Sequence, residues 1–238
     1  SPNRDEARYY GADVFAKTGD VPAALRMYGL LVQEGKSAFA VKSGSRAAEL
    51  ERRQKNYPGA IRNYQYVLSR SNERTDQVTA QLGLMDTYYS YKIDSAGIIA
   101  RQLVAGGNVV PGAQNRAQLM LGKVALSKAD FKTASAEFER AIALAKDVSG
   151  AEANYLIGEV QFRQKKYKES IATLLRFNEQ FDGFEYWKGK AFILVADNNV
   201  ALGETAQAKA VLTSIIENAA EAEIVAEAKI KLAAIETK

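Results

Sequence analysis

Neither cysteine nor histidine occurs among the 238 residues of this chain. Without cysteine the chain forms no disulfide, and without either residue it builds no zinc site of the Cys/His kind. The absence of histidine also removes the commonest general base and any Ser-His-Asp or Cys-His pair. The missing cysteine does not identify a compartment, because an oxidising environment and chance explain it equally well.

Proline is scarce and long apolar runs are missing. The chain has 4 prolines and much alanine, a composition that favours helices. No apolar run reaches the roughly 18 residues of a membrane-spanning helix, and no signal-like leader is present. The chain starts at Ser1 rather than at methionine. We therefore expect a mature form or a piece of a longer protein, and membrane association only through a missing anchor or through a partner.

Positive charge is in small excess, and that excess is uneven. The net charge is +4; residues 1–110 contain 15 Lys and Arg against 11 Asp and Glu, whereas residues 111–238 contain 17 of each kind. A nucleic-acid-binding domain usually carries a denser basic stripe, so we do not expect a nucleic-acid partner. A nucleic-acid-binding helical repeat stays as an alternative hypothesis, and it predicts binding that weakens steeply with salt.

Small residues recur along the chain in a fixed frame. In order they are Ala24, Ala60, Ala96, Ala134, Ser170 and Ala208, with spacings of 36, 36, 38, 36 and 38 residues. Around Ala134, for example, Gly122 lies twelve residues earlier, Phe138 four later and Ala141 seven later. Offsets of four and seven share one face of a helix, and an offset of twelve reaches across a turn into the preceding helix. The frame predicts about six helix–turn–helix hairpins with small residues where the two helices meet.

Residues 115–148 resemble the tetratricopeptide repeat, through Gly122, Phe131, Ala134, Phe138 and Ala141. The first unit and residues 151–184 and 189–222 are also similar to that family, whereas the second and third units are weaker matches. The resemblance implies an all-α, right-handed superhelical solenoid of about six hairpins, formed as a single domain over residues 1–238.

Two segments of the chain indicate whether this solenoid is continuous and where it ends. Residues 104–114 contain Gly106-Gly107 and Pro111, which predict either a hinge between halves 1–106 and 111–238 or a longer loop in one solenoid. Residues 221–236 predict a final helix, with an apolar stripe of Val225, Ala228, Leu232 and Ile235. We expect this helix to cap the solenoid, the alternative being that it continues into further repeats.

A narrower resemblance lies near the C-terminus, carried by Tyr186-Trp187, Gly189, Ala191, Gly203, Ala208 and Leu212. This segment is similar to repeats of bacterial envelope proteins associated with the Tol-Pal system and of outer-membrane-assembly lipoproteins. It departs from them at Asn218-Ala219, where those repeats usually have Tyr-Pro. The resemblance implies a periplasmic or cell-envelope location, with the cytoplasm as the alternative.

The family resemblance also implies a concave face lined by the first helix of each hairpin. Carried onto this chain, the candidate partner-binding residues are Tyr9, Asp13, Arg52, Arg53, Met85, Tyr88, Tyr89, Lys123, Tyr155, Glu159 and Phe162, with Leu126 beside Lys123. The family's clamp for a C-terminal carboxylate needs Lys and Asn where this chain has Tyr9 and Asp13, so we do not expect that mode. Tyrosine and arginine are common interface residues, and the set predicts a protein or peptide partner. One alternative is that the tyrosines of residues 87–92 pack between repeat hairpins. Another is that residues 49–55 are only a solvated helix face.

No catalytic or metal-binding pattern accompanies these residues. The chain has no glycine-rich phosphate loop and no paired metal motif. Glu223 and Glu227 lie one helical turn apart, but no histidine and no second carboxylate pair supports them as metal ligands. We expect a non-catalytic scaffold without cofactor or metal, or a non-catalytic part of a larger protein. The sequence specifies neither the partner nor the oligomeric state.

Overall fold

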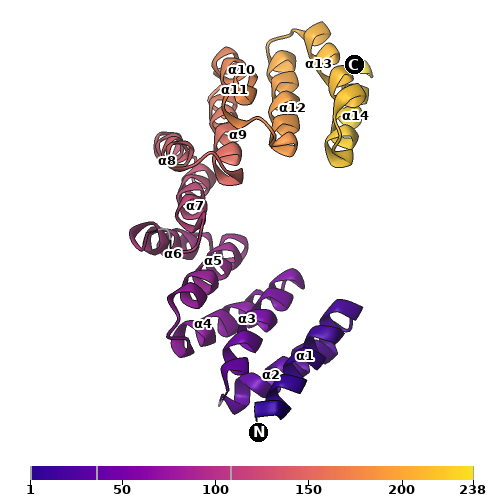
Figure 1. Ribbon diagram of the computed structural model, residues 1–238. Helices are drawn as coiled ribbons and strands as arrows, with labels where there is room; N and C mark the ends of the chain where they lie inside the picture. The colour runs from indigo at the N-terminus through magenta and orange to yellow at the C-terminus, as the bar shows by residue number, and fades with distance from the viewer. Residues whose placement is uncertain (1, 36, 108, 238) are drawn as a thin grey trace. The chain divides into compact units, whose positions relative to one another are not determined.

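The computed structural model describes residues 2–35, 37–107 and 109–237, and each regular element in these ranges is an α-helix (Figure 1). The helices form consecutive packed hairpins, as the repeat frame predicts. The chain divides into two compact units, residues 1–117 (unit 1) and residues 118–238 (unit 2). The predicted all-α hairpin architecture is therefore confirmed.

Unit 1 contains three hairpins and the start of a seventh helix. Its helices are α1 (Pro2–Thr18), α2 (Val21–Glu34), α3 (Ala38–Arg53), α4 (Tyr57–Arg70), α5 (Arg74–Tyr91), α6 (Ile93–Ala105) and the first residues of α7 (Ala113–Ser127). Helix α6 ends as predicted at Gly106, and α7 begins shortly after Pro111. Asn108 of that loop lies outside the described residues. The boundary between the units falls inside α7, and the alternative of halves 1–106 and 111–238 stays a prediction.

Unit 2 contains the rest of α7 and seven further helices. These are α8 (Phe131–Leu144), α9 (Val148–Arg163), α10 (Tyr167–Leu175), α11 (Phe177–Phe181), α12 (Glu185–Ala201), α13 (Thr205–Asn218) and α14 (Ala222–Glu236). The short helix α11 was not expected from the sequence. It arises because Arg176 leaves helical geometry at φ −84° and ψ 4° and so ends α10 after nine residues.

The turns inside the hairpins share one local geometry. A residue with positive φ stands one or two positions before the second helix in five hairpins, at Gly19, Lys55, Ala129, Lys165 and Gly203. In three of them an Asp or Asn then caps the second helix; the Asp130 carboxylate, for example, accepts a hydrogen bond from the Thr133 amide at 3.1 Å. Such a cap satisfies an amide that has no partner inside the helix. These turns fold each hairpin back on itself.

The small residues of the repeat frame lie where two helices meet. All six small residues that define the frame, from Ala24 to Ala208, are completely buried. In the α7–α8 hairpin, a Cβ on Gly122 would overlap the ring of Phe138, which is itself fully buried. Gly158 and Leu174 repeat this arrangement between α9 and α10. The prediction that small residues allow close approach of the paired helices is confirmed.

Helix α14 forms where the final helix was predicted, but its buried face differs in one position. Ile224 is fully buried, whereas Val225 is half-buried. Ile224 packs against Gly189 of α12, and Ala228, Leu232 and Ile235 belong to the same apolar cluster. Val225 is half-buried, as are Leu232 and Ile235, and Ile224 is a buried residue that the predicted stripe did not include.

Candidate functional site

The first helices of the hairpins in unit 1 line a groove of about 530 Å³, called here the unit 1 groove. Its walls come from α1, α3 and α5, together with Tyr64 of α4 and Arg116 of α7. Most of its charged residues stand on α3, at Lys42, Arg46, Glu49 and Arg52. Because these positions are three or four residues apart, they form one stripe along a single face of that helix.

Glu49 is the centre of the hydrogen-bond network in this groove. Its carboxylate accepts hydrogen bonds from Arg52 at 2.9 and 3.1 Å, from Arg53 at 2.8 Å and from the Tyr64 hydroxyl at 3.3 Å. Burial favours the neutral acid, but the two arginines outweigh it and lower the pKa of Glu49. Burial, followed by the charge of Glu49, raises the pKa of Tyr64 to about 12. The carboxylate is therefore ionised and already engaged.

A second network joins α1, α2 and α3. The Arg46 guanidinium donates a hydrogen bond to the Tyr9 hydroxyl at 3.4 Å and lies 3.8 Å from the Asp13 carboxylate. Asp13 also accepts a hydrogen bond from the Tyr28 hydroxyl. Burial and this hydrogen bond raise the pKa of Tyr28, so it stays a neutral donor. Asp13 is thus held by two neighbouring helices, while the Arg46 side chain stays 62% exposed.

The acids of the groove are held by neighbouring side chains, whereas two of its cations, Lys42 and Arg46, stay exposed, although Arg46 also pairs with Asp13. Asp86 pairs with Arg116, and Asp76 accepts a hydrogen bond from the Ser71 hydroxyl at 2.9 Å. In contrast, Lys42 is exposed, and its ammonium lies 5.4 Å from the centroid of the Phe39 ring. Lys42 and Arg46 are one helical turn apart on α3. A negatively charged group that enters the groove meets these two exposed cations.

The structure brings only some of the predicted residues of unit 1 into this groove. Tyr9 and Arg52 line it, and Asp13 and Arg53 line an adjoining cavity of about 310 Å³. Met85 is completely buried, so its side chain is not available to a partner and its assignment to the binding face was wrong. The reason is that α5 is buried on several sides, at Val78, Ala80, Leu82, Leu84 and Met85.

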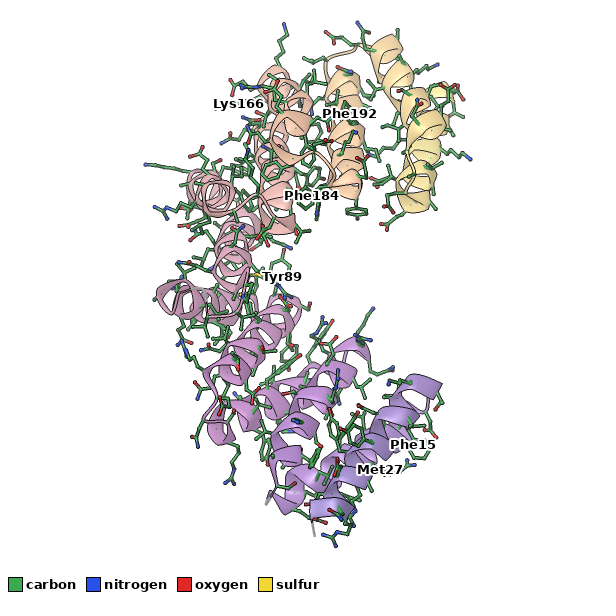
Figure 2. All side chains as sticks on the ribbon, in the orientation of Figure 1. Phe15, Met27, Tyr89, Lys166, Phe184 and Phe192 are labelled. Atoms are coloured by element: carbon green, nitrogen blue, oxygen red, sulfur yellow. The ribbon has the colours of Figure 1, made fainter. Side chains whose placement is uncertain are left out.

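The two tyrosines predicted on α5 are half-buried (Tyr89 is labelled in Figure 2). Tyr88 packs against the apolar cluster that contains Tyr64, Val67 and Leu84. This contact agrees with the alternative that these tyrosines pack between neighbouring hairpins. The sequence interpretation missed Lys42 and Arg46, although the polar stripe at positions 42, 46, 49 and 53 has helical spacing and was a usable signal.

The predicted residues of unit 2 lie on α7 and α9. Lys123 pairs with Glu152 at 2.9 Å, and Glu159 pairs with Arg163 one turn further along α9. The remaining two are aromatic, and each is half-buried against another ring: Tyr155 with Trp187 at 5.6 Å and Phe162 with Tyr167 at 5.6 Å. Leu126, expected to be free beside Lys123, is buried in the core of the α7–α9 region.

Two ion pairs join α12 to α14 in unit 2. Lys190 lies 2.8 Å from Glu227, and Lys231 lies 2.8 Å from Asp197. Burial and the nearby acids, Glu159 first among them, raise the pKa of Tyr155. The charged residues at these helix contacts are thus engaged with one another across neighbouring helices.

Neither a metal site nor a membrane span is found in the described part of the chain. Across residues 2–35, 37–107 and 109–237, no group of three or more acidic residues is placed to hold a metal ion. Within the same ranges, no helix combines the length and the apolar character needed to cross a bilayer.

Comparison with known proteins supports the resemblance to the tetratricopeptide repeat. Residues 119–182 match the family model described as tetratricopeptide repeat. This segment includes most of α7, all of α8, α9 and α10, and α11. No curated protein sequence is significantly similar to the chain. The likeness to envelope proteins of the Tol-Pal and outer-membrane-assembly type is not confirmed by these findings.

Solved structures with the same fold cover most of the chain. A tetratricopeptide repeat protein from Parabacteroides merdae is 14% identical, with a TM-score of 0.73 over 98% of this chain and 87% of that one. The C-terminal part of a repeat protein from Cytophaga hutchinsonii is 15% identical, with a TM-score of 0.63 over 88% and 78%. The MamA protein is 20% identical, with a TM-score of 0.54 over 74% and 90%. At these identities the likeness establishes the tetratricopeptide-type fold alone.

Proposed function

We propose that this chain is a non-catalytic scaffold that binds a protein or peptide partner in the unit 1 groove. Helical repeat proteins use the surface formed by successive equivalent helices for binding, and this groove spans three such helices. The observation that carries the proposal is the charge arrangement: the acids of the groove are engaged by neighbouring side chains, while Lys42 and Arg46 are exposed. The partner segment accordingly carries acidic residues.

Tyrosine strengthens this assignment. Tyr9 and Tyr64 line the groove next to the charged residues. Both rings are buried in unit 1, with 8% and 5% exposed, and their hydroxyls bond to Arg46 and Glu49. They hold the charged residues of the groove in place, so the groove selects its partner by charge and needs no covalent chemistry.

The proposed setting is a bacterial cell envelope. Support for this comes from the C-terminal segment with Tyr186-Trp187, Gly203 and Leu212, which is similar to repeats of envelope proteins. In that setting the chain displays its groove to another envelope protein, and it reaches the membrane through that partner or through an anchor.

The test uses the chain as immobilised bait with an envelope fraction of its native host. The double variant Lys42→Glu/Arg46→Glu reverses both exposed cations. The control variant Lys132→Glu reverses an exposed lysine of α8 instead. We expect one protein to be enriched by the wild type and by the control, and lost with the double variant. Equal capture by all three chains, or no enrichment by the wild type, contradicts the proposal.

A further inference from the structure

Unit 2 contains a cavity that the proposed function does not use. It has a volume of about 440 Å³ and lies between α12, α13 and the link 219–221; we call it the unit 2 pocket. Its lining is mostly apolar, with Phe192 on α12 (labelled in Figure 2) and Val211 and Ile215 on α13. None of the residues predicted to contact a partner lines it.

The preceding hairpin shows what fills the equivalent place. Ala219 stands eleven residues after Ala208, and Phe181 stands eleven residues after Ser170, so the two occupy the same position of the repeat frame. Phe181 is 1% exposed, and its ring lies 3.0 Å from the point where a Cβ of Gly150 would stand. By the same frame, Gly150 corresponds to Lys188, which lines the unit 2 pocket.

An aromatic ring is therefore present in one hairpin and replaced by a methyl group in the next. Phe181 also packs against two further rings, Phe177 at 5.7 Å and Phe184 at 6.2 Å, in the core of α9–α12. The α12–α13 hairpin has no ring at this position, and its α13 carries the small residues Ala210 and Ser214 along the cavity wall. Because Lys188 stands where the preceding hairpin has Gly150, the unit 2 pocket lies open between Lys188, Ala219 and α13.

The size and the lining suit an aromatic occupant. An apolar cavity of about 150 Å³ is large enough to bind benzene. The unit 2 pocket, at about 440 Å³, has room for a phenyl ring and part of a second apolar side chain. Ser214 and Asn218 are exposed polar residues of the lining. A ring can therefore enter from solvent without displacing the core.

The rim of the pocket is electronegative. Glu185 and Glu221 both line it, and Lys188 lies 3.5 Å from Glu185 and so neutralises one of these two carboxylates. Helix α13 also ends at the pocket, at Asn218, and the carbonyl end of a helix carries partial negative charge. A positively charged group beside the ring is favoured at this rim, and a negatively charged one is disfavoured.

We propose that the unit 2 pocket is a docking site for an aromatic side chain of a separate protein partner, carried next to a lysine or arginine. The ring packs against Phe192, Val211 and Ile215, and the cation faces Glu221. This site is formed entirely within unit 2, so it does not depend on binding at the unit 1 groove.

The test titrates small probes into the full-length chain and follows backbone amide shifts by NMR. Phenylalaninamide carries a ring and a positive charge, N-acetylphenylalanine carries the same ring with a negative charge, and leucinamide carries the charge without a ring. We expect phenylalaninamide to cause saturable shifts at Ala210, Ser214 and Ala219. Each of the other two probes is expected to bind about threefold or more weakly, in line with exposed charge pairs and small apolar differences. Equal binding of leucinamide, or shifts confined to other surfaces, overturns the proposal.

Variants that place an aromatic ring in the unit 2 pocket provide the matched comparison for probe binding. Ala219→Phe places in the sixth hairpin the ring that Phe181 supplies in the fifth, and it is expected to abolish the saturable shifts. Ser214→Phe places a ring in the same cavity from an exposed position. It replaces Ala219→Phe as the filled variant if Ala219→Phe lowers the thermal unfolding midpoint. The control Ala201→Phe adds a ring at an exposed position of α12, roughly 14 Å along the helix from Phe192, and leaves binding unchanged.

Sedimentation of the same variants distinguishes the source of the occupant. Under the proposal the wild type and Ala219→Phe have the same mass in solution. If the wild type self-associates and Ala219→Phe does not, the occupant is a second copy of this chain and the assignment to a separate partner is overturned. Unchanged probe binding by both filled variants overturns it as well.

Discussion

The two units share one repeat frame but differ in the ion pairs made by two of their helices, α3 and α12. In unit 1 the central carboxylate, Glu49, pairs with Arg52 and Arg53 on its own helix. In unit 2 the pairs of Lys190 and Lys231 join α12 to α14. Both units contain pairs of both kinds; Asp13 and Arg46 join two helices of unit 1, for example. The difference is local: the pairs of Lys190 and Lys231 link α12 directly to α14, whereas the pairs of Glu49 stay on α3.

The composition of the units follows the same division. Residues 1–117 contain 16 Lys and Arg against 11 Asp and Glu, and residues 118–238 contain 16 against 17. The surplus of cations in unit 1 leaves Lys42 and Arg46 exposed beside the groove. In unit 2 the two numbers are nearly equal. The units therefore share an apolar frame but differ in net charge.

The largest effect is expected from a change that breaks the frame in unit 2. Phe138→Ala removes a fully buried ring between α7 and α8 and is expected to lower the free energy of unfolding by about 3–5 kcal/mol. Because each hairpin contacts mainly its neighbours, hydrogen exchange is expected to rise most in α7–α9 and least in α1–α3. A uniform rise across both units would show that the units unfold as one and would contradict this expectation.

A smaller effect is expected when the central carboxylate of unit 1 is neutralised. Glu49→Gln removes the negative charge shared by Arg52 and Arg53 and is expected to cost about 1 kcal/mol near pH 7, since solvent screens this half-exposed network. Denaturant unfolding of both proteins measures the difference. The matched control Glu179→Gln, which affects an exposed pair with Arg176, is expected to change little.

The difference in stability between the wild type and Glu49→Gln is also expected to depend on pH, with a defined sign. The folded state lowers the pKa of Glu49 below its ordinary value of 4.5, so the carboxylate stabilises the fold fully above that pH. Its contribution decreases as the pH falls below 4.5 toward the folded-state pKa. The difference in unfolding free energy between wild type and Glu49→Gln is therefore expected to shrink over this range. A difference that grows on acidification would have the wrong sign.

The smallest effect is expected from the pairs between helices in unit 2. A double-mutant cycle with Asp197→Ala and Lys231→Ala is expected to give a coupling energy of about 0.2–1 kcal/mol, because both side chains are about one-third exposed. The coupling is expected to decrease in 1 M NaCl, where charges are strongly screened. A coupling that is insensitive to salt would mean that packing of the two side chains, and not their charge, joins α14 to α12.

Much of the fold was predictable because the signals are local and repeated. The small residues twelve apart, with apolar residues four and seven positions later, predicted the hairpins and their contacts. Helix α11 was missed, since five residues are too few to show a helical period. Met85 was misplaced because α5 is buried on several sides. On such a helix the pattern of apolar residues does not distinguish the face toward the groove from the face toward the core.

The sequence by itself determined the hairpins and which small residues lie between their helices, because capping, turn geometry and 3.6-residue periodicity act over a few residues. Only the tertiary structure decided which charges meet. Asp197 and Lys231 are 34 residues apart, and Lys190 and Glu227 are 37 apart. It also showed that a pocket lies open beside Ala219, whereas Phe181 is buried at the equivalent position of the preceding hairpin. These relations depend on the distance between helices that are remote in sequence, and periodicity carries no information about that distance.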